Sequence, residues 1–178
     1  MNDTTRRRLL AQLAACAAGM AWVQGAIGQQ AQGGVEHGSP PPKPGTPLPL
    51  PAVPLLDGGN FRPESADGQV LVLYWWASWC PFCALQSPLM NKLWLAQRGR
   101  GLQMLGLSID KTPEEARAYL ATHSYAFPSG WVTPAVAKAL PRPRGLPVTI
   151  VRGRDGRVLM AEAGQLFAED IEEIARFL

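Results

Sequence analysis

Beyond residue 55 the apolar positions of this 178-residue chain alternate between strand-like runs and helix-like stripes. Residues 70–75 form a continuous apolar, β-branched and aromatic run, which is typical of a buried strand. Leucines four residues apart then follow Pro81, and they predict a helix to about residue 97 with a kink at Pro88. Similar patterns predict further strands at 102–109, 148–151 and 158–163, and further helices at 113–123, 134–140 and 169–178. This order predicts an α/β fold with a mixed sheet and helices on both faces.

The N-terminal stretch has the pattern of an export signal. Three arginines at 6–8 precede eleven residues, 13–23, without a polar side chain, and residues 26–28 offer a small-residue cleavage site. The arginines also fit the twin-arginine export motif of bacteria. Two other outcomes stay open, because residues 9–27 are almost long enough for a membrane anchor and Cys16 could carry a lipid. All three outcomes place the body of the chain outside the cytoplasm, in the periplasm.

Residues 29–54 are predicted to form a tether. Their prolines are too dense for a helix or a central strand, so the segment should be extended and semi-rigid. Residues 55–178 then form one domain, and an apolar content of 47 % is enough for a core without structural disulfides. Without the predicted signal, residues 1–28, the net charge is +1. That charge excludes the strongly basic footprint of a nucleic-acid-binding protein.

Cys80 and Cys83 are the two cysteines of the predicted domain, at the junction of the first strand and the following helix. Such a pair can bind a metal, close a structural loop or exchange electrons as a reversible disulfide. A metal site needs more ligands, and the two histidines are His37 in the tether and His123 near a helix end. A structural disulfide across so short a loop removes little entropy from the unfolded chain, so it would add little stability. These points favour redox exchange.

The position of each cysteine predicts its role. Cys80 lies where the N-cap of the helix is expected, and Cys83 lies one turn later. A helix N-terminus presents unpaired N–H groups and about half a positive charge, which favour a thiolate. We therefore expect Cys80 to be the nucleophile and Cys83, which should be more buried, to resolve the mixed disulfide.

The stretch WASWCPFC, residues 76–83, resembles the W-A-x-W-C-x-x-C signature of thioredoxin-fold proteins. Pro88 matches the proline that kinks the helix of that family, and RGLPVT, residues 144–149, resembles the segment with its cis-proline. Residues 106–128 and 154–166 resemble the inserted segment and the closing hairpin of the exported TlpA/ResA-like branch. The resemblance extends over residues 52–178. It implies a three-layer, thioredoxin-like α/β fold.

The resemblance also implies a wall of side chains around the two cysteines. Its expected members are Trp79, Pro81, Phe82, Leu146 and Pro147. Pro147 is expected in the cis form and opposite the cysteines, in a loop that keeps metals off the thiolates in the family. Leu146 stands where many relatives have threonine, which implies a more apolar surface for the partner. We therefore expect neither a metal nor a cofactor.

The resemblance implies an exported thiol-disulfide oxidoreductase that acts on cysteine-containing extracytoplasmic proteins. Relatives of the TlpA/ResA type are kept reduced by a membrane partner, so we expect a reductase with a membrane thiol reductant. An oxidase or isomerase on the same pair stays open. Two other functions fit less well: thiol peroxidases carry a threonine where this chain has Ala77, and Sco-type copper-delivery proteins need a Cys-x-x-x-Cys pair. If the protein contacts a membrane, we expect this only through an uncleaved N-terminus or a lipid.

Two positions depart from the family pattern. Tyr74 stands six residues before Cys80, where thioredoxins bury an aspartate, and Gln86 stands where TlpA/ResA-like relatives often carry a glutamate. Such a carboxylate can move protons to and from the thiols. Two hypotheses stay open. In one, protons pass through water or the Tyr74 hydroxyl, and deprotonation of Cys83 is the slow step. In the other, Tyr74 and Gln86 are only packing residues, and another group transfers the protons.

Overall fold

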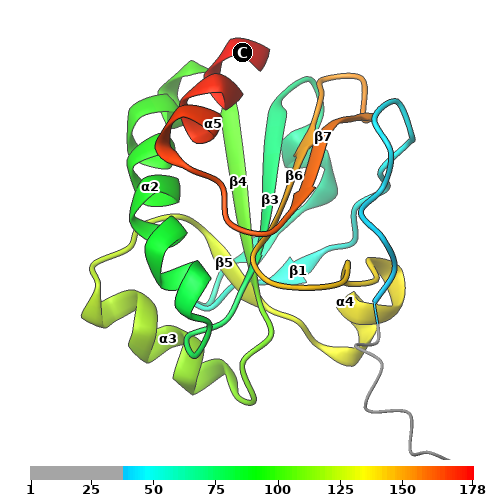
Figure 1. Cartoon of the computed structure of the whole chain (residues 1–178). Coiled ribbons are helices and arrows are strands. Elements are labelled where there is room, and N and C mark those ends of the chain that lie inside the picture. The colour runs from blue at the N-terminus through cyan, green and yellow to red at the C-terminus, as the bar shows by residue number, and fades with distance from the viewer. Residues whose placement is uncertain (1–37) are drawn as a thin grey trace, which may run out of the picture. The chain divides into compact units, whose positions relative to one another are not determined.

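The computed structural model describes residues 38–178, so the predicted signal and the first part of the predicted tether, 29–37, lie outside the described residues. Five strands form one mixed sheet in the order β5-β4-β3-β6-β7, as Figure 1 shows. β3 pairs in parallel with β4 and antiparallel with β6, while β5 extends the sheet in parallel and β7 antiparallel. The strands are β3 (Val70–Trp76), β4 (Leu102–Ser108), β5 (Ser129–Trp131), β6 (Val148–Arg152) and β7 (Val158–Ala163).

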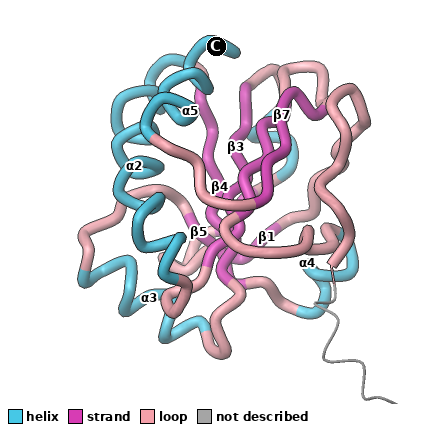
Figure 2. The backbone as a smooth tube through the Cα atoms, in the orientation of Figure 1, coloured by secondary structure: helices cyan, strands magenta, loops and turns pink. Residues whose placement is uncertain are grey.

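Helices cover both faces of this sheet, as Figure 2 shows by element type. They are α2 (Pro81–Gln97), α3 (Pro113–Thr122), α4 (Pro134–Ala139) and α5 (Ala168–Glu173), with short 3-10 segments at Pro63–Ala66, Arg98–Arg100 and Ile174–Phe177. The predicted α/β fold is therefore confirmed. The predicted last helix, 169–178, is shorter than expected, because its final turn continues as the 3-10 segment. Among the residues described, no helix is both long and apolar enough to cross a bilayer.

The central strand β3 is buried on both sides, because successive side chains of a strand point to opposite faces. One face packs against residues of α2, α3 and the C-terminal segment, and the other against residues of α4. The side chains on the first face are Val70, Val72, Tyr74 and Trp76, and those on the second are Leu71, Leu73 and Trp75. Trp75 and Trp76 are thus both core residues, and the run at 70–75 predicts this for Trp75.

Residues 38–54 correct the prediction of a tether that ends at residue 54. The segment is largely extended, but it packs onto the domain: Gly45 N–H donates to the carbonyl of Val158 at 2.7 Å, and the Leu48 side chain is buried. Strand β1, Val53–Pro54, pairs antiparallel with β2, Asn60–Phe61. The folded domain therefore begins before residue 55. Proline density prevents helix formation, but it does not prevent single apolar side chains from being buried between the prolines.

Candidate active site

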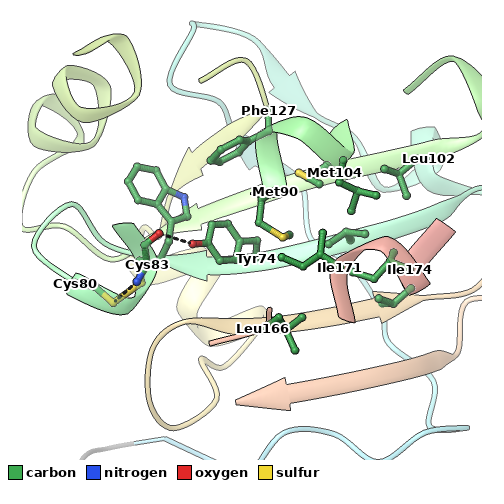
Figure 3. Close-up of a cluster of buried hydrophobic side chains, with 14 of the residues drawn as sticks. Tyr74, Cys80, Cys83, Met90, Leu102, Met104, Phe127, Leu166, Ile171 and Ile174 are labelled. Atoms are coloured by element: carbon green, nitrogen blue, oxygen red, sulfur yellow. Dashed lines mark hydrogen bonds between the residues drawn. A yellow bond between two sulfur atoms is a disulfide. The ribbon is translucent and has the colours of Figure 1, made fainter. Parts of the chain in front are cut away.

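The two cysteines lie at the N-terminal end of α2, where β3 passes into the helix. Cys80 is the N-cap residue, and its sulfur accepts a hydrogen bond from the backbone N–H of Cys83 at 3.2 Å. The two residues are joined by a disulfide, with their Cα atoms 5.2 Å apart (Figure 3). Cys80 is 4 % exposed and Cys83 is fully buried, so a partner reaches Cys80 more easily.

The local sequence explains why the helix begins at this point. Pro81 occupies the first helical position, where its fixed φ suits the helix and its missing N–H costs no hydrogen bond. The N–H of Cys80 donates to the carbonyl of Ala77 at 3.2 Å, which closes a turn just before the helix. The Cys83 N–H therefore points at the Cys80 sulfur, and together with the positive end of the helix dipole it would stabilise a thiolate there in the reduced protein.

The predicted wall residues fall into two groups. Trp79 and Phe82 project into solvent, with exposed fractions of 61 % and 56 %, and Pro81 is also exposed. Leu146 is half-buried and packs against the cluster that contains both cysteines. The Leu146–Pro147 bond is cis, as the resemblance implies. Because Val148 pairs with Trp75 on β3, Pro147 lies at the end of the sheet from which the cysteine loop departs.

A buried carboxylate, which the sequence analysis did not identify, holds the loop before the cysteines. Asp110 is 3 % exposed and follows β4. One of its oxygens accepts from the Ser78 hydroxyl at 2.6 Å and from the Ser78 backbone N–H at 3.0 Å. The other oxygen accepts from the Ser108 hydroxyl at 2.7 Å. Ser78 lies inside the turn that Ala77 and Cys80 close, so Asp110 ties the cysteine loop to the sheet.

Gln86, at the position where relatives often carry glutamate, connects three elements. Its side chain is fully buried in α2. The amide nitrogen donates to the Thr149 hydroxyl on β6 at 2.9 Å, and the amide oxygen accepts from the Leu166 N–H at 2.7 Å. Gln86 thus links the helix of the cysteines to the strand after the cis-proline and to the segment before α5.

Tyr74 lies beside Cys83, and its hydroxyl contacts the Cys83 backbone (Figure 3). The hydroxyl donates to the Cys83 carbonyl at 3.3 Å and shares a hydrogen bond with the Ser87 hydroxyl at 3.0 Å. Burial raises the pKa of the Tyr74 hydroxyl well above its usual value, although the hydrogen bond with Ser87 acts in the opposite direction. Tyr74 therefore stays protonated at neutral pH. The Tyr74 hydroxyl is therefore a poor base, and it donates a hydrogen bond to the Cys83 carbonyl in the first turn of α2.

Within residues 38–178, no three His, Cys, Asp or Glu side chains gather as metal ligands would. His123 is exposed, and its ring stacks on Tyr125 with the centroids 5.3 Å apart. The Cys80–Cys83 disulfide can itself undergo redox chemistry, and it exchanges two electrons at a time.

Comparison with known proteins identifies the family. The model of the AhpC/TSA family matches residues 44–158, which is more than half of the chain. The chain belongs to the AhpC/TSA family. Among curated relatives, the thiol:disulfide interchange protein HelX of Rhodobacter capsulatus is 31 % identical over 126 residues, covering 68 % of this chain and 69 % of HelX. The thiol-disulfide oxidoreductase ResA of Bacillus thuringiensis subsp. konkukian is 24 % identical over 122 residues, covering 66 % and 68 %.

The fold also agrees with that of solved structures. A thiol:disulfide interchange protein of the thioredoxin family from Chlorobium tepidum superposes with a TM-score of 0.69 at 24 % identity, covering 76 % of this chain and 96 % of that one. Together with the Cys80–Cys83 pair, these relatives make the chain a thiol-disulfide oxidoreductase of the ResA type. The predicted family and the predicted enzyme class are both confirmed.

The Asp110 contacts lead to a prediction for this oxidoreductase. In the reduced Asp110→Asn protein, the thiolate of Cys80 should titrate at higher pH than in the wild type. The reason is that the neutral amide oxygen accepts weaker hydrogen bonds from Ser78 than the carboxylate does, which loosens the turn that places Cys80 at the N-cap. The measurement is thiolate absorbance against pH. A pure charge effect has the opposite sign, because removing a nearby negative charge would lower the titration midpoint.

Ser108→Ala is the matched control for this prediction. It removes two hydrogen bonds with Asp110, one to the carboxylate and one from the backbone N–H, without removing any donor on the cysteine loop. It should therefore lower the free energy of unfolding by about 2 kcal/mol and leave the Cys80 titration in place. Ser78→Ala should shift the titration in the same direction as Asp110→Asn. A downward shift in Asp110→Asn, or an equal shift in the Ser108 control, would show that Asp110 does not position the loop.

Proposed function

We propose that this chain is an exported reductase of disulfides in other extracytoplasmic proteins, with Cys80 as the attacking and Cys83 as the resolving cysteine. The observation that carries the proposal is the asymmetry of the pair: Cys80 is slightly exposed at the helix N-cap, and Cys83 is fully buried one turn later. The names of HelX and ResA support the same chemistry, and the predicted export signal supports a place in the periplasm. The twin-arginine route is one pathway that could export the chain to the periplasm.

The reaction balances as two thiol-disulfide exchanges. The Cys80 thiolate attacks one sulfur of the target disulfide, so that a mixed disulfide forms and one target thiolate leaves. The Cys83 thiolate then attacks the Cys80 sulfur and releases the second target thiolate. Two electrons have passed to the target, two protons are taken up by its thiolates, and the chain holds the Cys80–Cys83 disulfide seen in the structure. A dithiol of a membrane reductant would return it to the reduced form.

The wall residues define where the target would bind. Trp79, Pro81 and Phe82 offer an exposed surface beside Cys80, while Leu146 and Pro147 lie at the neighbouring end of β6. Exchange between thiols requires no cofactor, because the sulfur atoms themselves carry the electrons. The proposal therefore needs a cysteine-containing protein and a thiol reductant as partners, and no metal.

The experiment that tests the proposal measures the reduction potential of the Cys80–Cys83 pair in the purified protein against glutathione or dithiothreitol buffers. A reductase should lie closer to the thioredoxin value, about −270 mV, than to the value of the oxidant DsbA, about −120 mV. The Cys80→Ser protein serves as control and should show no two-electron transition. A potential near that of DsbA would contradict the reductase and favour an oxidase.

A further inference from the structure

Exposed apolar side chains gather at the cysteine end of α2. Six large hydrophobic side chains are exposed among the described residues, and three of them, Trp79, Phe82 and Leu85, lie within six residues of Cys80. A fourth, Phe167, is 63 % exposed and directly follows Leu166, whose N–H donates to Gln86 on α2. We refer to Trp79, Phe82, Leu85 and Phe167 as the apolar patch. Such a concentration around one end of a helix marks an interaction surface.

A groove continues this patch along the helix. It has a volume of about 250 Å³ and lies between α2 and α5, which run side by side in Figures 1 and 2. Leu89 and Ala96 line it from α2, and Ala168 and Ile171 line it from α5. Leu89 stands one turn after Leu85, on the same side of the helix. Ala168 directly follows Phe167, so the groove begins where the patch ends.

We propose that the apolar patch and this groove together bind an apolar segment of the protein whose disulfide is exchanged at Cys80. This inference rests on the proposed function. Any target must bring its sulfur to Cys80, and its chain then passes over Trp79 and Phe82, which flank that residue. Beyond these two residues, the target chain can continue into the groove between α2 and α5, whose walls are apolar. The site therefore selects targets whose reactive cysteine is followed or preceded by apolar side chains.

The dimensions set the length of the segment. From Phe82 to Ala96 the helix advances by about 21 Å, at 1.5 Å per residue. An extended chain covers that distance in about six or seven residues, at 3.3 Å per residue. Alternate side chains of such a segment face the helix, so about three apolar residues would enter the patch and the groove.

Charge at the rim of the groove is balanced and accessible. Lys92 on α2 and Glu172 on α5 approach to 3.4 Å across it, and both side chains are at least 70 % exposed. An ion pair in that setting contributes little stability, so a ligand can open it at low cost. The groove therefore offers no net charge to attract a charged peptide, and apolar contact remains its basis for selection.

The test compares peptides that carry the same disulfide-linked fluorescent leaving group on a single cysteine. One peptide is short, one adds a tail of about seven residues with leucine at alternate positions, and one adds a glycine-serine tail of equal length. Leucine tails are made on either side of the cysteine. The wild-type protein should react with the better leucine-tailed peptide with a kcat/KM about tenfold higher than with the other two.

Two variants remove the preference by different means. Phe167→Ser removes an apolar side chain from the patch. Ala96→Glu places a charge on an exposed helical position that lines the groove. Each should bring the ratio between leucine-tailed and short peptides close to one. Leu95→Ser is the matched control, because Leu95 is a 48 % exposed leucine of the same helix that does not line the groove. It should keep the wild-type ratio.

The outcomes separate this inference from the proposed function. Failure to react with any peptide would remove the proposed function itself. Equal rates with all peptides in the wild-type protein would overturn the inference and leave the proposed function intact. If a second copy of the chain covers the groove instead, sedimentation should show a dimer that Ala96→Glu disperses, without any preference for leucine tails; that result would also overturn the inference.

Discussion

A Cys83→Ala protein is expected to accumulate mixed disulfides with its targets, at a level at least about tenfold above that of a Cys80→Ala protein. Cys80 stands at the helix N-cap with its sulfur next to the N–H of Cys83, so it can attack as a thiolate. Without the second thiol the mixed disulfide cannot be resolved. In the Cys80→Ala protein, the remaining Cys83 is fully buried and cannot meet a target sulfur. Non-reducing gels and mass spectrometry of the trapped adducts provide the measurement.

Both variants should be made in a Cys16→Ser background, because Cys16 is the third cysteine of the chain and can trap targets by itself in molecules that keep the predicted signal. The variant that lacks all three cysteines measures the background. Equal trapping by Cys80 alone and Cys83 alone would contradict the assignment of attacking and resolving roles. It would also mean that the first turn of α2 opens readily enough to expose Cys83.

Gln86→Glu is expected to speed release of the mixed disulfide near neutral pH by about tenfold or more, with little change in the first attack by Cys80. Glutamate has nearly the same shape as glutamine, and hydrogen-bond donors stand at both ends of the Gln86 side-chain amide. The Leu166 N–H already donates to one end of the side chain, and the Thr149 hydroxyl can turn to donate to the other. A carboxylate held there would accept the proton of Cys83, which Tyr74 cannot do because burial raises its pKa.

Gln86→Met is the control that separates acid–base chemistry from packing. Methionine has a similar length but offers neither a proton acceptor nor the two hydrogen bonds of Gln86. It should lower the free energy of unfolding and should not speed release. Stopped-flow measurement of both steps, with thermal unfolding of each variant, provides the comparison. If release in a folded Gln86→Glu protein stays at the wild-type rate, the proton has another route and the missing carboxylate is not the cause of a slow step.

The long elements of the fold could be predicted from the sequence because each has a local pattern. The run at 70–75 and the leucines behind Pro81 gave the core strand and the cysteine helix to within a residue. Strand β5, Ser129–Trp131, was missed because three residues next to a proline carry no periodicity. The packing of 38–54 was missed for a related reason: Gly45 and Leu48 bind residues more than a hundred positions away.

In the site too, residues in local motifs could be predicted, whereas residues that act through long-range contacts could not. The cysteine pair and Pro147 belong to short motifs, so their place at the helix start and before β6 could be predicted. Asp110 could not, because its role depends on contacts with Ser78, 32 residues earlier. Gln86 was noted as a departure from the family, but its hydrogen bonds join residues 63 and 80 positions apart and appear only in the folded chain.

The redox state of Cys80 and Cys83 inside cells tests the central claim most directly. Cells that express the full chain are quenched in acid, free thiols are alkylated with a mass tag, and the tags on the Cys80–Cys83 peptide are counted by mass spectrometry. A reductase kept ready by a membrane reductant should carry two tags in most molecules, and Cys80→Ser should carry one. A pair that is mostly disulfide in these cells would contradict the account and make the protein an oxidant.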